Sequence, residues 1–349
     1  MKKHFLTFLI ALISSMAIAR QGDGVTLAAG EQPQISIDSK GIVRVVFGRD
    51  DKIYCSTSMD KGNTYSEPAL VAEVPKMHLG MTRGPQLASS KNYSVITAQD
   101  ELGSIHCFKL KHAVSKWEEI QPVNDIKGSA PEGLMSIAAD YNDNFYAVWL
   151  DIRIGKKNNI FFSALKAVED KWSENVLAYK SPEGTVCGCC KPSIAVRNSK
   201  VVLMFRNWLA GSRDLYMMQS LNYGKTFSPA RKLGMGTWVL EGCPMDGGGV
   251  SIDDAGNVHT AWQREGAVFY CKPSAREEKL AVGKSVSITL QQNLPVVMLQ
   301  DKDGVKLISV ENNQQKLIGS GSFLKSIQLP DNQMICVWEQ DNKIMVKKV

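Results

Sequence analysis

Short apolar runs that end in a bulky aromatic residue recur along the whole chain. They read RVVF at residues 44–47, YAVW at 146–149, VLMF at 202–205, HTAW at 259–262 and ICVW at 335–338. Polar turn sequences such as DSKG, DYND, DDAG and PDN precede them, and such turns typically join the strands of tight hairpins. The pattern predicts many short antiparallel strands rather than helices.

A second pattern shows that these strands are grouped into modules. Aromatic residues followed by polar ones recur at positions 65, 117, 172 and 227, a spacing of 52 to 55 residues. Within one module, residues 192–233, four short β-rich runs alternate with turns: PSIAVRN, VVLMFRNW, DLYMMQS and PARKL. Four strands in a repeat of this length are typical of a β-propeller blade. We therefore predict an all-β propeller fold.

The modules begin near Pro33, Gly84, Gly133, Pro192, Gly248, Ser287 and Ser322. The last module supplies only three strands, and the segment GVTLAA at residues 24–29 precedes the first module without a partner. Pairing this segment with the C-terminal strand KIMVKKV would close the ring and remove two free sheet edges. We predict seven four-stranded blades, with six as the alternative because the modules after residue 286 are short and weakly patterned.

The N-terminus predicts export. Lys2 and Lys3 precede an apolar run over residues 5–13, and Ala17-Ile18-Ala19 is a small-x-small cleavage signal. We expect a signal peptide over residues 1–19, a single propeller domain over 20–349, and a periplasmic or secreted protein. The formal net charge of the 349 residues is +6, without any block of Lys and Arg. We expect a monomer with no nucleic-acid partner and no membrane span.

Two turn sequences carry a family resemblance. Ser58-x-Asp60-x-Gly62-x-Thr64-Tyr65 is repeated as Ser220-x-Asn222-x-Gly224-x-Thr226-Phe227. Both resemble the Asp boxes, or bacterial neuraminidase repeats, of sialidase-like propellers. In such a turn the short Asp or Asn side chain accepts backbone N–H bonds and glycine supplies a positive φ. The box bears on the fold, because it lies between the third and fourth strands of a blade, away from the ligand funnel.

The funnel of a propeller is lined by loops that lead into the innermost strands and by loops that join second to third strands. In this chain those loops are rich in arginine, and guanidinium groups suit carboxylate or sulfate ligands. The predicted ligand-binding residues are Arg83, Arg153, Arg206, Asn207, Arg213 and Arg264. An acidic glycan or another anionic small ligand is the expected partner, although a salt bridge is an equally good explanation for any one arginine.

The resemblance to sialidases implies an arginine triad, an aspartic acid and a tyrosine nucleophile. Arg83 and Pro85 match part of the aromatic-Arg-Ile-Pro signature, and Asp100 lies in the following loop, where the acid would be. The last tyrosine is Tyr270, however, so the final blades supply no nucleophile. We expect no ordinary sialidase activity, and we keep a glycoside hydrolase with Asp100, Asp151 or Asp246 as acid or base as the alternative to a binding protein.

Three cysteines in four residues, Cys187, Cys189 and Cys190, precede one inner strand, and Cys243 precedes the next. The blade register brings the four together, and export favours a disulfide from Cys189 or Cys190 to Cys243. A copper or zinc site with these thiolates and Met245 or His78 is the first alternative, because thiolate and thioether ligands select such ions. The metal site is the less favoured interpretation, because two adjacent residues cannot easily both point toward one ion. Free thiols or a strained vicinal disulfide are the remaining alternative. We expect no other cofactor.

The same loops resemble a group of secreted sialidase-like proteins. Its shared features are a Cys-x-Cys-Cys loop, then Arg-Asn and Arg-Asp pairs, then a Cys-Pro-x-x-Gly-Gly-Gly segment one blade later. This chain has the loop at residues 187–190, the pairs at 206–207 and 213–214, and the segment at 243–249. The resemblance implies no established activity. A glycan-directed function, as enzyme or binder, is the leading hypothesis, and a metalloprotein is the alternative.

Overall fold

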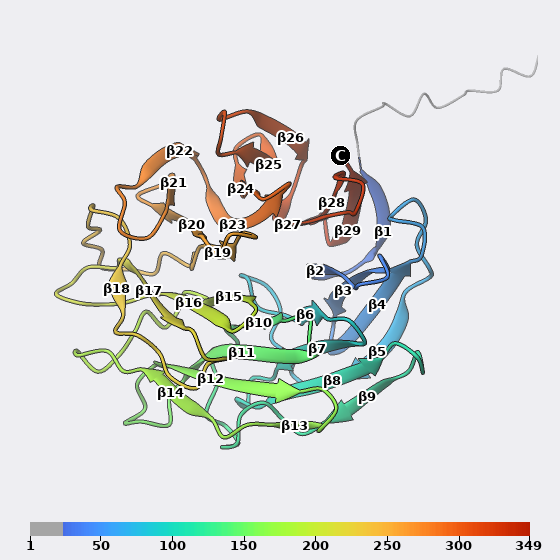
Figure 1. The fold of residues 1–349 in the computed structure, drawn as a ribbon, viewed down its shortest axis with the longest axis horizontal. Helices are drawn as coiled ribbons and strands as arrows, with labels where there is room; N and C mark the ends of the chain where they lie inside the picture. Colours follow the sequence, from blue (N-terminus) through green and yellow to red (C-terminus); the bar gives the residue numbers. More distant parts are fainter. Residues whose placement is uncertain (1–23) are drawn as a thin grey trace, which may run out of the picture.

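The computed structural model describes residues 24–349, and the predicted signal peptide lies outside the described residues. This part of the chain forms seven antiparallel sheets arranged around a common centre (Figure 1). It contains 29 strands, and none of its residues form a helix that is long and apolar enough to cross a membrane.

Each sheet is one blade, and in blades 1 to 6 the strands follow one another in chain order from the inside outward. Blade 1 contains β2 (Glu31–Ile37), β3 (Val43–Arg49), β4 (Lys52–Ser58) and β5 (Ala69–Glu73). Blade 2 contains β6 (Gln86–Ser89), β7 (Tyr93–Gln99), β8 (Ile105–Lys111) and β9 (Trp117–Ile120). Blade 3 contains β10 (Met135–Ala139), β11 (Asn144–Asp151), β12 (Asn159–Lys166), β13 (Lys171–Trp172) and β14 (Val176–Tyr179). Its outer strand is split, because both β13 and β14 pair with β12.

The second half of the ring has the same plan. Blade 4 contains β15 (Ser193–Arg197), β16 (Lys200–Arg206), β17 (Leu215–Ser220) and β18 (Arg231–Lys232). Blade 5 contains β19 (Gly249–Ile252), β20 (Val258–Arg264), β21 (Ala267–Cys271) and β22 (Glu278–Val282). Blade 6 contains β23 (Lys284–Gln291), β24 (Leu294–Asp301), β25 (Gly304–Ser309) and β26 (Gln315–Gly319). Blade 7 contains β27 (Ser322–Gln328), β28 (Met334–Gln340), β29 (Lys343–Lys348) and β1 (Val25–Ala29).

The ring is closed by strands from both ends of the described chain. β1 pairs with β29 in antiparallel register, with Val25 opposite Val346, so the N-terminal strand completes blade 7. The seven inner strands then contact one another in an unbroken cycle from β2 through β27 and back to β2. The predicted closure and the predicted count of seven blades are both confirmed.

The hydrophobic core lies between the blades. Seven clusters of buried apolar residues each join two adjacent blades, one for every interface of the ring. The aromatic residues that end the predicted apolar runs belong to five of them: Phe47, Trp149, Phe205, Trp262 and Trp338 are at most 2% exposed. The repeated pattern therefore marks the inter-blade contacts, because a sheet must bury both faces in this architecture.

The two turns compared with Asp boxes join third to fourth strands, as expected. Asp60 accepts hydrogen bonds from the N–H groups of Asn63 and Thr64, and its other oxygen accepts the Thr64 hydroxyl at 2.6 Å. The hydrogen bond from the Thr64 hydroxyl does most to lower the pKa of Asp60, to about 2. Tyr65 packs in the interface with blade 7. The turn thus stabilises the joint between two blades.

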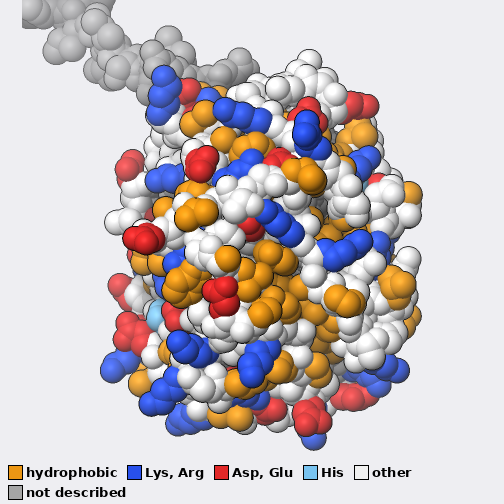
Figure 2. All heavy atoms as spheres, turned by 90° about the vertical axis from the view of Figure 1, so that its left-hand side faces the viewer, with side chains coloured by type: hydrophobic (Ala, Val, Ile, Leu, Met, Phe, Trp, Pro, Cys, Tyr) orange, Lys and Arg blue, Asp and Glu red, His pale blue; other side chains and the backbone are white. Residues whose placement is uncertain are grey.

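On the side of the molecule shown in Figure 2, basic and acidic side chains are interspersed, with apolar side chains between them. No single charge dominates this outer face. The cysteines and arginines singled out in the sequence lie instead at one end of the ring.

Candidate functional site

The loops that lead into inner strands and the loops that join second to third strands meet at the same end of the propeller, called here the loop end. In blade 4, Val186 before β15 forms a bridge with Asn207 after β16. Ser212 in the same β16–β17 loop forms a bridge with Val239, which precedes β19 of blade 5. Three chain segments are thus joined edge to edge around the cysteine loop.

The cysteine loop places three thiols around one point. The Cys187 sulfur lies 3.4 Å from that of Cys190 and 3.6 Å from that of Cys189. Cys187 and Cys190 are each 1% exposed, and Cys189 is partly exposed. The adjacent residues Cys189 and Cys190 therefore both turn toward Cys187, contrary to the expectation from their sequence positions.

A positive side chain stabilises the central sulfur of this group. Arg213 donates a hydrogen bond from Nη1 to the Cys187 sulfur at 3.2 Å. The hydrogen bonds that Cys187 shares with Cys189 and then with Cys190 lower the pKa of the Cys187 thiol most, and the charge of Arg213 lowers it further. The bond to Cys187 does most to raise the pKa of Cys189, and burial does most to raise the pKa of Cys190. Of the three thiols, Cys187 is therefore the one whose ionisation the loop favours.

All eight cysteines lie within the described residues and are free, so the expected disulfide to Cys243 is not present in the structure. Cys243 is exposed, in the loop before β19, and it contributes to raising the pKa of Cys189, after the larger effect of Cys187. Cys243 is not one of the three cysteines whose sulfurs lie within 4.8 Å of one another, so its approach to the cysteine loop stays a prediction. Cys55, Cys107, Cys271 and Cys336 are buried in strands, as predicted.

The glycine run explains how the two loops approach so closely. A Cβ atom on Gly247 would overlap the main-chain oxygen of Lys191 and lie 2.8 Å from the Lys191 carbonyl carbon. Only glycine permits backbone to pass backbone at this distance. Gly247 therefore lets the segment before β19 lie directly against Lys191, the residue that follows Cys190.

The arginines predicted to bind a ligand all lie at the loop end, but most of them have partners within the protein. Arg206 is 1% exposed and donates to the main-chain oxygens of Arg213, Asp246 and Gln263 at 2.6 to 3.0 Å. Arg83 donates to the Glu132 main-chain oxygen at 2.7 Å. Arg206 consequently links chain segments and presents no free donor face to a ligand.

Arg153 and Arg264 form ion pairs instead of a shared clamp. Arg153 contacts Asp151 at 2.8 Å and Asp125 at 2.7 Å, and Asp151 is fully buried with further bonds from Ser129 and Trp149. Asn207, also predicted to bind a ligand, is buried and donates to the Tyr179 hydroxyl at 2.7 Å. These side chains hold loops in place. For the arginines this is the salt-bridge role that the sequence analysis gave as the alternative to ligand binding.

Arg264 pairs with Glu277 at 2.9 Å, and this pair supplies a pH-dependent contribution to stability. Burial opposes ionisation of Glu277, but hydrogen bonds from the N–H groups of Met235 and Gly236 and from Arg264 outweigh it and lower its pKa to about 2. The folded pKa is below the unfolded value near 4.5, so the contribution is complete above that value and disappears as the pH falls toward 2.

Replacing Glu277 by glutamine should therefore lower the free energy of unfolding by about 1 kcal/mol at pH 7, after solvent screening. The difference from the unmodified protein should shrink steadily between about pH 5 and pH 2. Urea unfolding across this range tests the prediction. Glu278→Gln, at the exposed neighbouring position, is the control and should show no such trend. If Glu277→Gln lowered the free energy of unfolding equally at every pH, the lowered pKa of Glu277 would not be the source of the effect.

The three candidate acids occupy different environments. Asp100 lies in the β7–β8 loop, 7% exposed, and its Oδ2 lies 3.1 Å from His106 Nε2. Asp151 is held by Arg153. Asp246 is 4% exposed and accepts the N–H groups of Gly248 and Val286 at 3.0 and 3.2 Å. Burial raises the pKa of Asp246, although the charge of Arg206 opposes this. Of the three, only Asp246 lines the central cavity described next.

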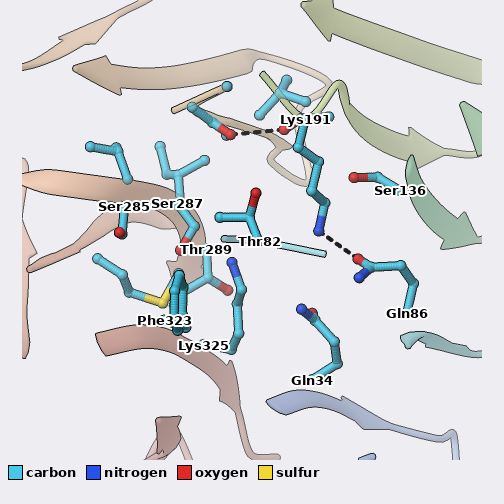
Figure 3. A pocket seen from close by; sticks show the side chains of 18 of the residues that line it. Gln34, Thr82, Gln86, Ser136, Lys191, Ser285, Ser287, Thr289, Phe323 and Lys325 are labelled. Atoms are coloured by element: carbon cyan, nitrogen blue, oxygen red, sulfur yellow. Dashed lines mark hydrogen bonds between the residues drawn. The ribbon is translucent and has the colours of Figure 1, made fainter. Parts of the chain in front are cut away.

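A cavity of about 230 Å³ occupies the centre of the ring beneath the cysteine loop. Its lining comes from inner strands and the residues that precede them, and includes Gln34, Gln86, Ser136, Lys191, Asp246, Ser287, Thr289, Phe323 and Lys325. Figure 3 shows Lys191, Lys325 and Gln34 pointing into one space, with Thr82 between the two lysines. Lys191 donates to the Gln86 Oε1 atom at 2.5 Å.

The two lysines share an environment that disfavours positive charge. Burial lowers the pKa of Lys191 far below its usual value, and the charge of Lys325 lowers it further. Burial also lowers the pKa of Lys325, partly offset by Asp246. Sequence reasoning missed both lysines. The available signals were the position of Lys191 directly after Cys190 and a lysine inside the inner strand SFLKSIQ.

Comparisons with known proteins identify the fold. No family model and no curated protein matches the chain. Solved structures do match, at 10 to 11% sequence identity. They include an ulvan lyase of polysaccharide lyase family 25 bound to -[GlcA(1-4)Rha3S]-, which matches with a TM-score of 0.54 over 94% of this chain and 94% of that chain.

A Hadza microbial sialidase, Hz136, matches with a TM-score of 0.52 at 10% identity over 93% of this chain and 68% of that chain. The β-propeller domain of the Trilobed protease from Pyrococcus furiosus also matches with a TM-score of 0.52, at 10% identity over 93% and 97%. The chain is a seven-bladed β-propeller. Proteins with quite different names share this fold, so the fold by itself does not determine what the protein does.

Proposed function

We propose that the protein binds an anionic carbohydrate, and that the central cavity holds its charged group. The observation that carries this proposal is the meeting of two amino groups, on Lys191 from blade 4 and Lys325 from blade 7, in one cavity. Among the described residues that line the cavity, Asp246 alone carries a carboxylate. A carboxylate or sulfate placed between the lysines would replace mutual repulsion by attraction.

The rest of the lining suits a sugar. Hydroxyl and amide side chains on several inner strands offer both donors and acceptors: Gln34, Gln86, Ser136, Ser287 and Thr289. Phe323 adds an aromatic face in the same space. The volume of about 230 Å³ is below the roughly 300–1,000 Å³ of pockets for drug-sized ligands. A single acidic sugar unit at a chain end therefore fits this cavity better than an internal stretch of polysaccharide.

Binding is favoured over hydrolysis by the arrangement of carboxylates. Glycoside hydrolysis ordinarily needs two carboxyl groups that flank the scissile bond, roughly 5 to 9.5 Å apart. The described lining of the cavity supplies one, Asp246, while Asp151 is fully buried against Arg153. Asp100 is paired with His106 in the β7–β8 loop. A sialidase-like hydrolase with Asp100 as acid remains the second candidate, carried by this partly buried carboxylate at the loop end.

The acidic saccharide bound to the ulvan lyase suggests the first ligands to test, because that lyase shares the fold. Binding of glucuronic acid and of sulfated monosaccharides should be measured by calorimetry at pH 7, with glucose as the uncharged comparison. The charged sugars should bind and glucose should not. Lys325→Gln should weaken binding at least tenfold, because it removes one of the two amino groups that would face the anion in a partly buried site.

Lys302→Gln is the matched control, because Lys302 is exposed in the β24–β25 turn and makes the same change in net charge. It should bind like the unmodified protein. Equal weakening in both variants would reduce the effect to overall charge and contradict the proposal. Turnover of an aryl sialoside that Asp100→Ala abolishes would instead favour the hydrolase.

A further inference from the structure

The cysteine cluster, defined as Cys187, Cys189 and Cys190, is the densest group of soft ligand atoms in the described part of the chain. Its three sulfurs lie within 4.8 Å of one another. The backbone of the loop is anchored to β16, because the Cys187 N–H donates to the Arg206 main-chain oxygen at 3.1 Å and Val186 bridges Asn207. The cluster is therefore held by the sheet rather than by a free loop.

The spacing of the sulfurs is that of ligands around one ion. Four thiolates at about 2.3 Å from a tetrahedral zinc are separated by about 3.8 Å, and three around a trigonal copper would be farther apart. The observed separations from Cys187, 3.4 and 3.6 Å, are closer to the tetrahedral value. They exceed a disulfide bond of about 2.05 Å, and a disulfide would use only two of the three sulfurs.

The surroundings offer a candidate fourth ligand and compensating charge. Cys243 is exposed in the β18–β19 loop, and this loop approaches the cysteine loop where Gly247 lies against the main chain of Lys191. Arg213 donates to the Cys187 sulfur at 3.2 Å, and hydrogen bonds of this kind orient the ligands of a metal ion. The guanidinium of Arg206 is buried nearby. Four thiolates around a divalent cation leave two negative charges, which these two arginines balance.

We propose that Cys187, Cys189 and Cys190 form a zinc-binding site, with Cys243 as the fourth ligand. Binding would release a proton from each thiol that is not already ionised. The ion would join the β14–β15 loop to the β18–β19 loop. It would thereby hold Lys191, the residue after Cys190, at the edge of the central cavity.

The test uses the full mature chain, reduced and freed of metal, titrated with Zn²⁺ alone against a chromogenic chelator. We expect one ion per chain. Cys187→Ser should weaken binding at least 100-fold, because it removes the sulfur that contacts both others, and Cys243→Ser should weaken it less. Cys336→Ala, which removes a thiol buried in β28, should bind like the unmodified protein. Circular dichroism checks that each variant is folded.

A second measurement needs no variant. Co²⁺ in place of Zn²⁺ should give the sulfur-to-cobalt charge-transfer absorption of a tetrahedral thiolate site, and bound metal should protect the cluster cysteines from alkylation. Absence of these signals, or equal Zn²⁺ affinity in Cys187→Ser, would overturn the proposal. The proposal would also be overturned if protein isolated from its host without reductant contained a disulfide within the cluster and no bound metal. None of these readouts depends on the sugar-binding cavity.

Discussion

Replacing Arg206 by methionine is expected to lower the free energy of unfolding by about 3 to 5 kcal/mol, the range for breaking a buried charged network. Arg206 donates four hydrogen bonds to three main-chain oxygens, those of Arg213, Asp246 and Gln263. These oxygens belong to the β16–β17 loop, the β18–β19 loop and strand β20. Methionine preserves length but donates nothing, so the buried carbonyl groups lose these donors.

Urea unfolding at pH 7 measures the effect, and Arg231→Met is the matched control. Arg231 begins β18 in the same blade, and its side chain is exposed. The control should change stability by no more than about 0.5 kcal/mol. Arg206→Lys should fall between the two, because lysine retains the charge but not the planar set of donors. Equal stability of Arg206→Met and Arg231→Met would show that Arg206 is not the link between the loops.

Replacing Gly247 by alanine should cost about 3 kcal/mol or more, at the upper end of overpacking effects. The added methyl group would overlap the main-chain oxygen of Lys191 and approach its carbonyl carbon and nitrogen to 2.8 and 3.0 Å. Backbone atoms cannot rotate away as a side chain can, so the two loops must separate. Lys191 would then shift at the cavity, and we expect weaker binding of glucuronic acid in any fraction that folds.

Gly242→Ala separates this steric effect from loss of glycine flexibility. Gly242 lies in the same loop, and its nearest neighbour atom would be 3.7 Å from an added Cβ, an ordinary contact. Thermal unfolding followed by circular dichroism should show a midpoint close to that of the unmodified protein for Gly242→Ala and a much lower one for Gly247→Ala. Matching midpoints would mean that the loops at Gly247 and Lys191 have room to separate.

The cysteine cluster and the cavity are neighbours in the chain as well as in space. Lys191 follows Cys190, and Asp246 lies three residues after Cys243. The zinc proposal and the carbohydrate proposal therefore concern two parts of one loop end, yet each has its own measurement. Loss of metal binding with intact sugar binding, or the reverse, would separate them.

The architecture was determined by the sequence alone, because its signals are local. Apolar runs ending in residues such as Trp149 and Trp338 repeat with the blades, and polar turns separate them. Counting these modules predicted seven blades, and the unpaired segment at residues 24–29 predicted the pairing of β1 with β29.

The chemistry of the site was decided only by the tertiary structure. No local pattern distinguishes an arginine that binds a ligand from Arg206, whose partners are main-chain oxygens up to 57 residues away. Cys189 and Cys190 face one sulfur because of the loop conformation, which their adjacency in the chain does not reveal. Lys191 and Lys325 meet because seven inner strands converge on one axis, so residues separated by more than a hundred positions share a single cavity.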